Sequence, residues 1–136
     1  MKRAFLWLVL VGSVVVVLGV LFQAFSIAAY IRSGEEDWLD AHGGMSLIVH
    51  LGQLAVVIGA LGAFWGRWTA VGAAVGFLVL SIAQLFALGD TEEEGSWANG
   101  FHGMLALVVL LAAVAYWQRA KRELGVSWPS GAGGGA

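Results

Sequence analysis

The chain contains no cysteine among its 136 residues. Disulfide bonds, thiolate metal sites and cysteine nucleophiles are therefore excluded. Charge is scarce as well, since only 12% of the residues are Asp, Glu, Lys or Arg. The sequence also lacks Gly-x-Ser-x-Gly, His-Glu-x-x-His and a phosphate-binding glycine loop with its lysine. The common hydrolase, metalloprotease and nucleotide-binding motifs are thus absent.

Hydrophobic residues are abundant instead: they make up 60% of the chain, and the mean hydropathy is +0.84. Crossing the hydrocarbon core of a bilayer takes about 20 apolar residues in a helix. Four segments meet that length, and we expect them at Ala4–Ile31, Gly44–Trp65, Thr69–Gly89 and Trp97–Gln118. None of them holds an Asp or Glu, so the buried carboxylates on which ion-driven transporters depend are missing.

The Lys and Arg residues predict the orientation in the membrane. Six of the seven, all except Arg32, flank the segments on one side, and eight of the nine acids lie in the two opposite loops, 32–44 and 89–100. Short loops rich in Lys and Arg stay in the cytoplasm. We therefore expect a multi-pass protein of the plasma (inner) membrane with both termini cytoplasmic. A net charge of -2 argues against nucleic acid as a partner.

The two halves of the chain repeat one pattern. Gln23 is followed after 19 residues by His42-Gly43, and Gln84 after 18 residues by His102-Gly103, with an acidic loop between each pair. The sequence predicts an all-α bundle of four transmembrane helices built from two tandem helical hairpins. The domain spans residues 1–123, with repeats at about 4–65 and 69–118, and residues 124–136 form a flexible Gly-rich tail. Gly62-x-x-x-Gly66 and Gly72-x-x-x-Gly76 predict close helix contacts.

The repeated histidines suggest a cofactor site. If the second and fourth helices are diagonal in the bundle, His42 and His102 face each other at equal depth near the outer end. Two imidazoles on facing helices suit the axial ligation of a haem b, and Gly43, Gly44, Gly100 and Gly103 leave room for a flat macrocycle. The alternative is that both histidines are interfacial, with water or loop carbonyls as their partners.

Further polar residues follow the helical period. On the second helix, His42, Ser46, His50 and Gln53 fall within an arc of about 80°. His50 lies about 12 Å along the helix from His42. Together with Gln23, Gln53 and Gln84, it is a candidate for lining the haem edge or a quinone pocket. The alternative is that these side chains form hydrogen bonds between helices without binding a ligand.

Three hypotheses of function follow from these residues. The first is a haem b protein that carries electrons from membrane quinol to an acceptor outside. The second is an accessory subunit of a larger membrane complex that docks through its acidic outer loops, although these loops could simply be solvated. The third is a copper or small-solute handling protein, suggested by Met45 and Met104 beside the two outer histidines. We expect an electron carrier or an accessory protein rather than a stand-alone enzyme.

The duplicated pattern of Gln23 and Phe25 before His42-Gly43, and of Gln84 and Phe86 before His102-Gly103, resembles a family of small four-helix membrane proteins, frequent in actinobacteria, whose function is unknown. The likeness covers residues 4–118. It implies that a histidine opens the second and fourth helices and that a glutamine lies in the first and third. An arginine often follows the first histidine in that family, whereas Gly43 does so here. The architecture is also similar to that of small membrane b-type cytochromes.

Overall fold

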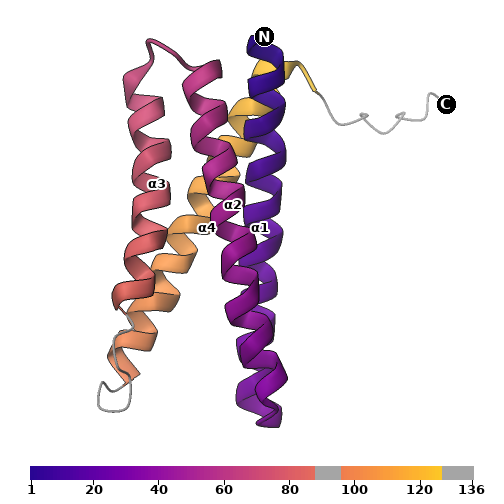
Figure 1. Ribbon diagram of the computed structural model, residues 1–136, viewed down its shortest axis with the longest axis vertical. Coiled ribbons are helices and arrows are strands. Elements are labelled where there is room, and N and C mark those ends of the chain that lie inside the picture. The colour runs from indigo at the N-terminus through magenta and orange to yellow at the C-terminus, as the bar shows by residue number, and fades with distance from the viewer. Residues whose placement is uncertain (88–95, 127–136) are drawn as a thin grey trace, which may run out of the picture.

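The computed structural model describes residues 1–87 and 96–126, and in these ranges the chain is all-helical, without a strand. The helices are α1 (Lys2–Ser33), α2 (Glu36–Ala63), α3 (Trp68–Ala87) and α4 (Ser96–Leu124). Figure 1 shows them side by side as one elongated bundle. All four are long and apolar enough to cross a membrane. Helices satisfy their own backbone hydrogen bonds, as a lipid environment requires.

The expected segments are present, but the helices are longer than their apolar cores. α2 begins at Glu36, eight residues before the predicted start at Gly44. A left-handed glycine, Gly34, ends α1, and its N–H donates to the carbonyl of Tyr30 at 2.8 Å. Only Gly34 and Glu35 separate the first two helices, and acids in the first turn of α2 favour its N-terminus. Residues 127–136 of the predicted tail and most of the second acidic loop lie outside the described residues.

The four helices form a ring in which α1 contacts α2 and α4, and α3 contacts the same two helices. α2 and α4 are therefore diagonal partners, as the histidine hypothesis requires. In Figure 1, α4 slants behind the others from α3 at one end to α1 at the other. The histidines lie deeper than the sequence suggests, because His42 and His102 each follow the first residue of their helix by six positions.

Glycines bring α1 and α2 into backbone contact. A Cβ atom on Gly12 would stand 2.7 Å from the carbonyl oxygen of Gly52, and one on Gly59 would stand 2.8 Å from the carbonyl oxygen of Phe5. The α2 glycines of these two contacts, Gly52 and Gly59, are seven residues apart. The predicted contact at Gly62 is present, because a Cβ there would meet the ring of Phe5. The predicted contact at Gly72-x-x-x-Gly76 is wrong, because no atom of the described residues lies within 4 Å of a Cβ at either glycine.

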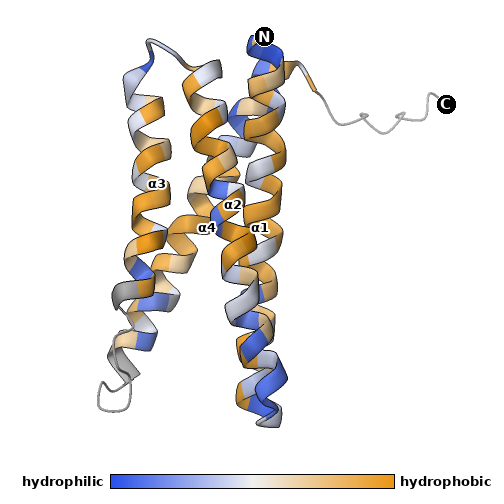
Figure 2. Ribbon diagram, viewed as in Figure 1, coloured by the Kyte–Doolittle hydropathy of each residue, from blue (hydrophilic) through white to orange (hydrophobic). Residues whose placement is uncertain are grey.

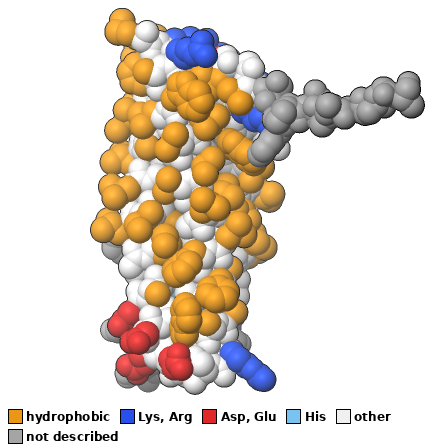
Figure 3. Space-filling view, turned by 90° about the vertical axis from the view of Figure 1, so that its right-hand side faces the viewer, with side chains coloured by type: hydrophobic (Ala, Val, Ile, Leu, Met, Phe, Trp, Pro, Cys, Tyr) orange, Lys and Arg blue, Asp and Glu red, His pale blue; other side chains and the backbone are white. Residues whose placement is uncertain are grey.

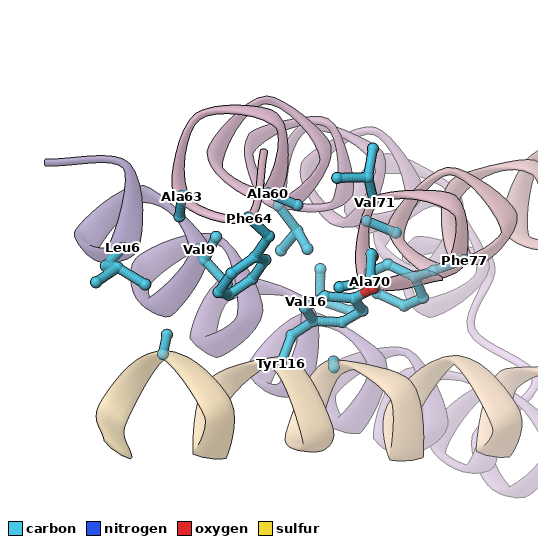
Figure 4. Close-up of a cluster of buried hydrophobic side chains, with 14 of the residues drawn as sticks. Leu6, Val9, Val16, Ala60, Ala63, Phe64, Ala70, Val71, Phe77 and Tyr116 are labelled. Carbon is cyan, nitrogen blue, oxygen red and sulfur yellow. The ribbon is translucent and has the colours of Figure 1, made fainter. Parts of the chain in front are cut away.

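The hydrophobic core fills only one half of the bundle. Its buried side chains come from residues 6–20 of α1, 49–63 of α2, Phe64 just after it, 70–77 of α3 and 109–120 of α4. Figure 4 shows this cluster around Phe64, which is fully buried. The Tyr116 hydroxyl donates to the carbonyl of Ala70 at 2.6 Å and joins α4 to α3. The opposite half of the bundle, where the histidines lie, is not filled in this way.

Charge separates the two ends of the bundle. We call the end with Lys2, Arg67 and Arg119 the basic end, and the end with Glu36 and Asp37 the acidic end. Figure 2 shows hydrophobic helices between more hydrophilic ends, and Figure 3 shows an apolar belt with basic groups above and, below, acidic groups beside a basic side chain. At the basic end, the carboxylate of Glu123 pairs with Lys2 at 3.2 Å and Arg67 at 2.7 Å. These ion pairs tie α4 to α1 and to the turn between α2 and α3.

The glycine contact makes a stability prediction. Gly12→Ala is expected to lower the free energy of unfolding by about 1–3 kcal/mol, because the new methyl group meets backbone atoms that cannot move aside. Gly76→Ala adds the same methyl group to open space and is expected to be neutral or to stabilise by up to about 1 kcal/mol. Unfolding in detergent, followed by circular dichroism, measures both. Equal effects of the two substitutions would contradict the contact.

Candidate functional site

A cavity of about 280 Å³ lies in the half of the bundle that the core leaves unfilled. All four helices contribute to its wall, and most of the wall is aliphatic. Its polar members are the three histidines, two glutamines and two serines of this region: His42, His50, His102, Gln23, Gln84, Ser46 and Ser81. The volume is close to the lower bound of about 300 Å³ for small-molecule pockets. These seven polar side chains therefore surround one space.

The imidazoles of His42 and His102 face each other across the bundle. Their ring centres are 6.4 Å apart, and their planes are inclined by 51°. From His42 to His50 and from His102 to Leu110, the nine aligned positions are buried, half-buried or exposed in the same way in the two helices. The two histidines thus occupy equivalent places on the inner faces of α2 and α4.

His42 is held by α1. Its Nδ1 lies 3.0 Å from the backbone oxygen of Gln23. Because a carbonyl oxygen only accepts, Nδ1 carries the proton and the lone pair of a neutral ring is on Nε2. The side-chain amide of Gln23 donates to the Ser46 hydroxyl at 2.8 Å. A carbonyl that fixes the tautomer and orientation of a histidine is what metal-ligating histidines require.

His50 lies deeper and is oriented in the same way. Its Nδ1 donates to the carbonyl of Ser46 on its own helix at 2.6 Å. Its Nε2 is then the acceptor, and the Ser81 hydroxyl on α3 donates to it at 3.4 Å. His50 and Ser81 thus form a polar pair on the cavity wall, and neither has an equivalent in the other hairpin, where Leu110 and Val20 stand at the aligned positions.

The second hairpin leaves two polar atoms at the cavity without the hydrogen bonds that their counterparts make in the first. Nδ1 of His102 and Nε2 of Gln84 are enclosed, yet neither has a hydrogen-bond partner within the part of the chain that the structure describes. The counterparts of these two atoms in the first hairpin are both bonded. Part of the reason is chemical, since the position equivalent to Ser46 is Ala106, which has no hydroxyl to accept from Gln84.

Five of the six predicted site residues line this cavity, and Gln53 does not. Gln53 is fully buried below the cavity, where its amide donates to the carbonyl of Phe77 on α3 at 3.4 Å. Ser46, on the predicted polar face of α2, and Ser81 also line the cavity, although neither is among the predicted site residues. Of the four predicted glycines, only Gly103 lines the cavity.

The sulfur ligands of the copper hypothesis are not at the cavity. Met45 packs beside Gly19 of α1, with its sulfur 3.6 Å from the position of a Cβ there, and Met104 is 51% exposed on the outer face of α4. Among the described residues, no cluster of three or more His, Cys, Asp or Glu side chains is placed to hold a metal ion. The possible metal ligands at the cavity are thus the imidazoles alone.

No protein-family model, no curated protein and no solved structure matches this chain. The resemblance to the actinobacterial four-helix family therefore stays a prediction.

The hydrogen bonds of the histidines predict their tautomers. In the neutral state, His42 and His50 are expected to carry their proton on Nδ1, because each donates from that nitrogen to a carbonyl oxygen. Nitrogen-15 chemical shifts of the histidine-labelled protein, assigned with His42→Asn and His50→Asn, measure this. A proton on Nε2 of either ring would show that its carbonyl contact is absent.

Proposed function

We propose that this chain is an integral membrane electron carrier that holds a haem b between His42 and His102 and receives electrons from membrane quinol. The observation that carries the proposal is the pair of imidazoles 6.4 Å apart on diagonal helices. An iron bonded to two imidazole nitrogens at about 2 Å each places the ring centres roughly 6 Å apart. The separation between these histidines suits that arrangement.

The donor set also fits the group. Bis-imidazole ligation suits a low-spin haem, whose bound iron supplies reversible one-electron transfer. The Gln23 carbonyl orients His42 so that Nε2 is free to ligate. A macrocycle is larger than this 280 Å³ cavity, which is partly open to the surface, so part of it would lie outside the cavity, beside Gly103. Aliphatic side chains around the cavity limit access of water.

The proposed placement in the plasma membrane rests on the charge distribution. The basic end carries Lys2, Arg67 and Arg119, which favours the cytoplasmic side for both termini. Exposed acids at the other end, among them Glu35, Glu36 and Asp37, then face outward. They offer a surface to which a cationic redox partner is attracted, on the same side of the membrane as the histidines.

An accessory subunit of a larger membrane complex is the second candidate. The exposure of α4 supports this candidate. Only 17% of the most apolar 18-residue stretch of α4 is buried, compared with 39% of that stretch in α1. Phe101, Leu107 and Leu111 are among the side chains that α4 exposes. Lipid covers such a face as well as a partner helix does. The two candidates are separated by colour, since an accessory subunit has no haem.

The haem proposal is tested by a reduced-minus-oxidised visible spectrum of the protein purified in detergent after expression with ample haem. The wild type is expected to show low-spin haem b bands, and His42→Ala and His102→Ala are each expected to lose them, because each removes one axial ligand. His50→Ala is the matched control and should keep the bands. A colourless wild-type protein would contradict the haem proposal and favour the accessory subunit.

The absence of native cysteine allows a direct test of topology. Asp37→Cys is expected to react with a membrane-impermeant maleimide added to intact cells, because this position is exposed at the acidic end. Arg122→Cys, exposed at the basic end, should react only after the cells are opened. The reverse pattern would show that the termini lie outside.

A further inference from the structure

Three polar groups on the cavity wall are not used by the proposed histidine pair. They are His50 on α2 and Ser81 and Gln84 on α3. Gln84 is only 6% exposed, and its amide nitrogen is enclosed without a partner among the described residues. A buried donor left unpaired destabilises the folded state. A ligand oxygen that accepts from this amide removes that destabilisation.

The donors and acceptors of this group define the ligand. Ser81 donates to Nε2 of His50, which leaves the lone pairs of its hydroxyl oxygen free to accept a ligand hydroxyl. The same hydroxyl can turn to donate to a ligand carbonyl. The Gln84 amide donates to an oxygen in either case. A ligand whose oxygen alternates between carbonyl and hydroxyl is thus accommodated in both of its forms.

The rest of the wall sets the polarity of the ligand. It consists largely of aliphatic side chains, such as Val20, Ile27 and Leu110. Of the side chains that line the cavity in the described part of the chain, none is Lys, Arg, Asp or Glu. A carboxylate or phosphate ligand would find no counter-charge there and would pay for its desolvation. The lining therefore suits an uncharged, lipid-soluble ligand.

We propose that His50, Ser81 and Gln84 form a binding subsite for the head group of a lipid-soluble quinone or quinol. One ring oxygen lies between the Ser81 hydroxyl and the Gln84 amide, and the apolar tail lies against the aliphatic wall. This subsite rests on the proposed function, because it places the electron donor beside the haem-binding histidines. His50 marks its far end, about 12 Å along α2 from His42, and Gln84, the counterpart of Gln23, marks the end nearer to the histidine pair.

Binding of a short-tailed 2-methyl-1,4-naphthoquinone derivative to the full-length protein in detergent, by isothermal titration calorimetry, tests the subsite. Ser81→Ala and Gln84→Leu are each expected to weaken binding about fivefold, the loss of one hydrogen bond. Two matched controls are expected to bind as the wild type does. Ser13→Ala removes a buried serine bonded only within α1, and Gln53→Leu removes a buried glutamine outside the cavity. Equal weakening by the controls, or no effect of the two subsite variants, overturns the subsite.

A photoreactive azidoquinone on the wild-type protein gives a test that needs no substitution. Labelling is expected in peptides that contain residues 81–85 and 106–110, which line the cavity, and an excess of the naphthoquinone should suppress it. Labelling confined to other segments overturns the subsite.

The visible spectrum separates the two proposals. A coloured protein that does not bind the quinone overturns the subsite alone, and a colourless protein that binds it as described overturns the haem site alone.

Discussion

The contact between the backbones of α1 and α2 is the constraint on which the rest of the structure depends. Gly12 and Gly52 allow no side chain between the two helices, and this fixes how one helix lies along the other. That register puts the Gln23 carbonyl within 3.0 Å of Nδ1 of His42. A helix pair separated by larger side chains would not hold the carbonyl at hydrogen-bonding distance. The orientation of His42 is thus a result of the packing between Gly12 and Gly52, which lies further along the same helix pair.

The second hairpin lacks this constraint, and its polar groups show the difference. Gly72 and Gly76 of α3 face open space, and the Gln84 amide and Nδ1 of His102 are unpaired among the described residues. The same residue types, in equivalent positions, are bonded in one hairpin and unbonded in the other. What differs is how closely the helices approach and whether a serine or an alanine stands beside the glutamine.

Much of the fold could be predicted from the sequence, because hydropathy and helical period report directly on lipid exposure. The four helices and the inward faces of His42 and His102 followed from those patterns. The beginning of α2 did not, because residues 36–43 are polar and hydropathy does not distinguish a polar helix from a loop. Gly72-x-x-x-Gly76 was misjudged for a related reason: the motif permits a close contact but does not name the neighbouring helix.

The site was predicted less fully than the fold. Gln53 shares a face with His42, yet it lies outside the cavity. At its level the hydrophobic core is fully packed, and its amide donates to the carbonyl of Phe77. Helical periodicity predicts the face of the helix on which a side chain lies. It does not predict how far along the bundle the cavity ends and the packed core begins. The unpaired amide of Gln84 has a signal in the sequence, since Ala106 stands where the first hairpin has Ser46, but the distance between the helices at His102 has none.

The division of the bundle into a packed half and a hollow half has an electrical consequence. In a bilayer, the packed half is a dry, low-dielectric layer that separates the cavity from the basic side. A charge that crosses the whole membrane works against the transmembrane potential by about 2.3 kcal/mol per 100 mV. A charge that enters and leaves the cavity on the acidic side avoids that work. Placed as proposed, electron exchange at the cavity is insulated from the potential across the membrane.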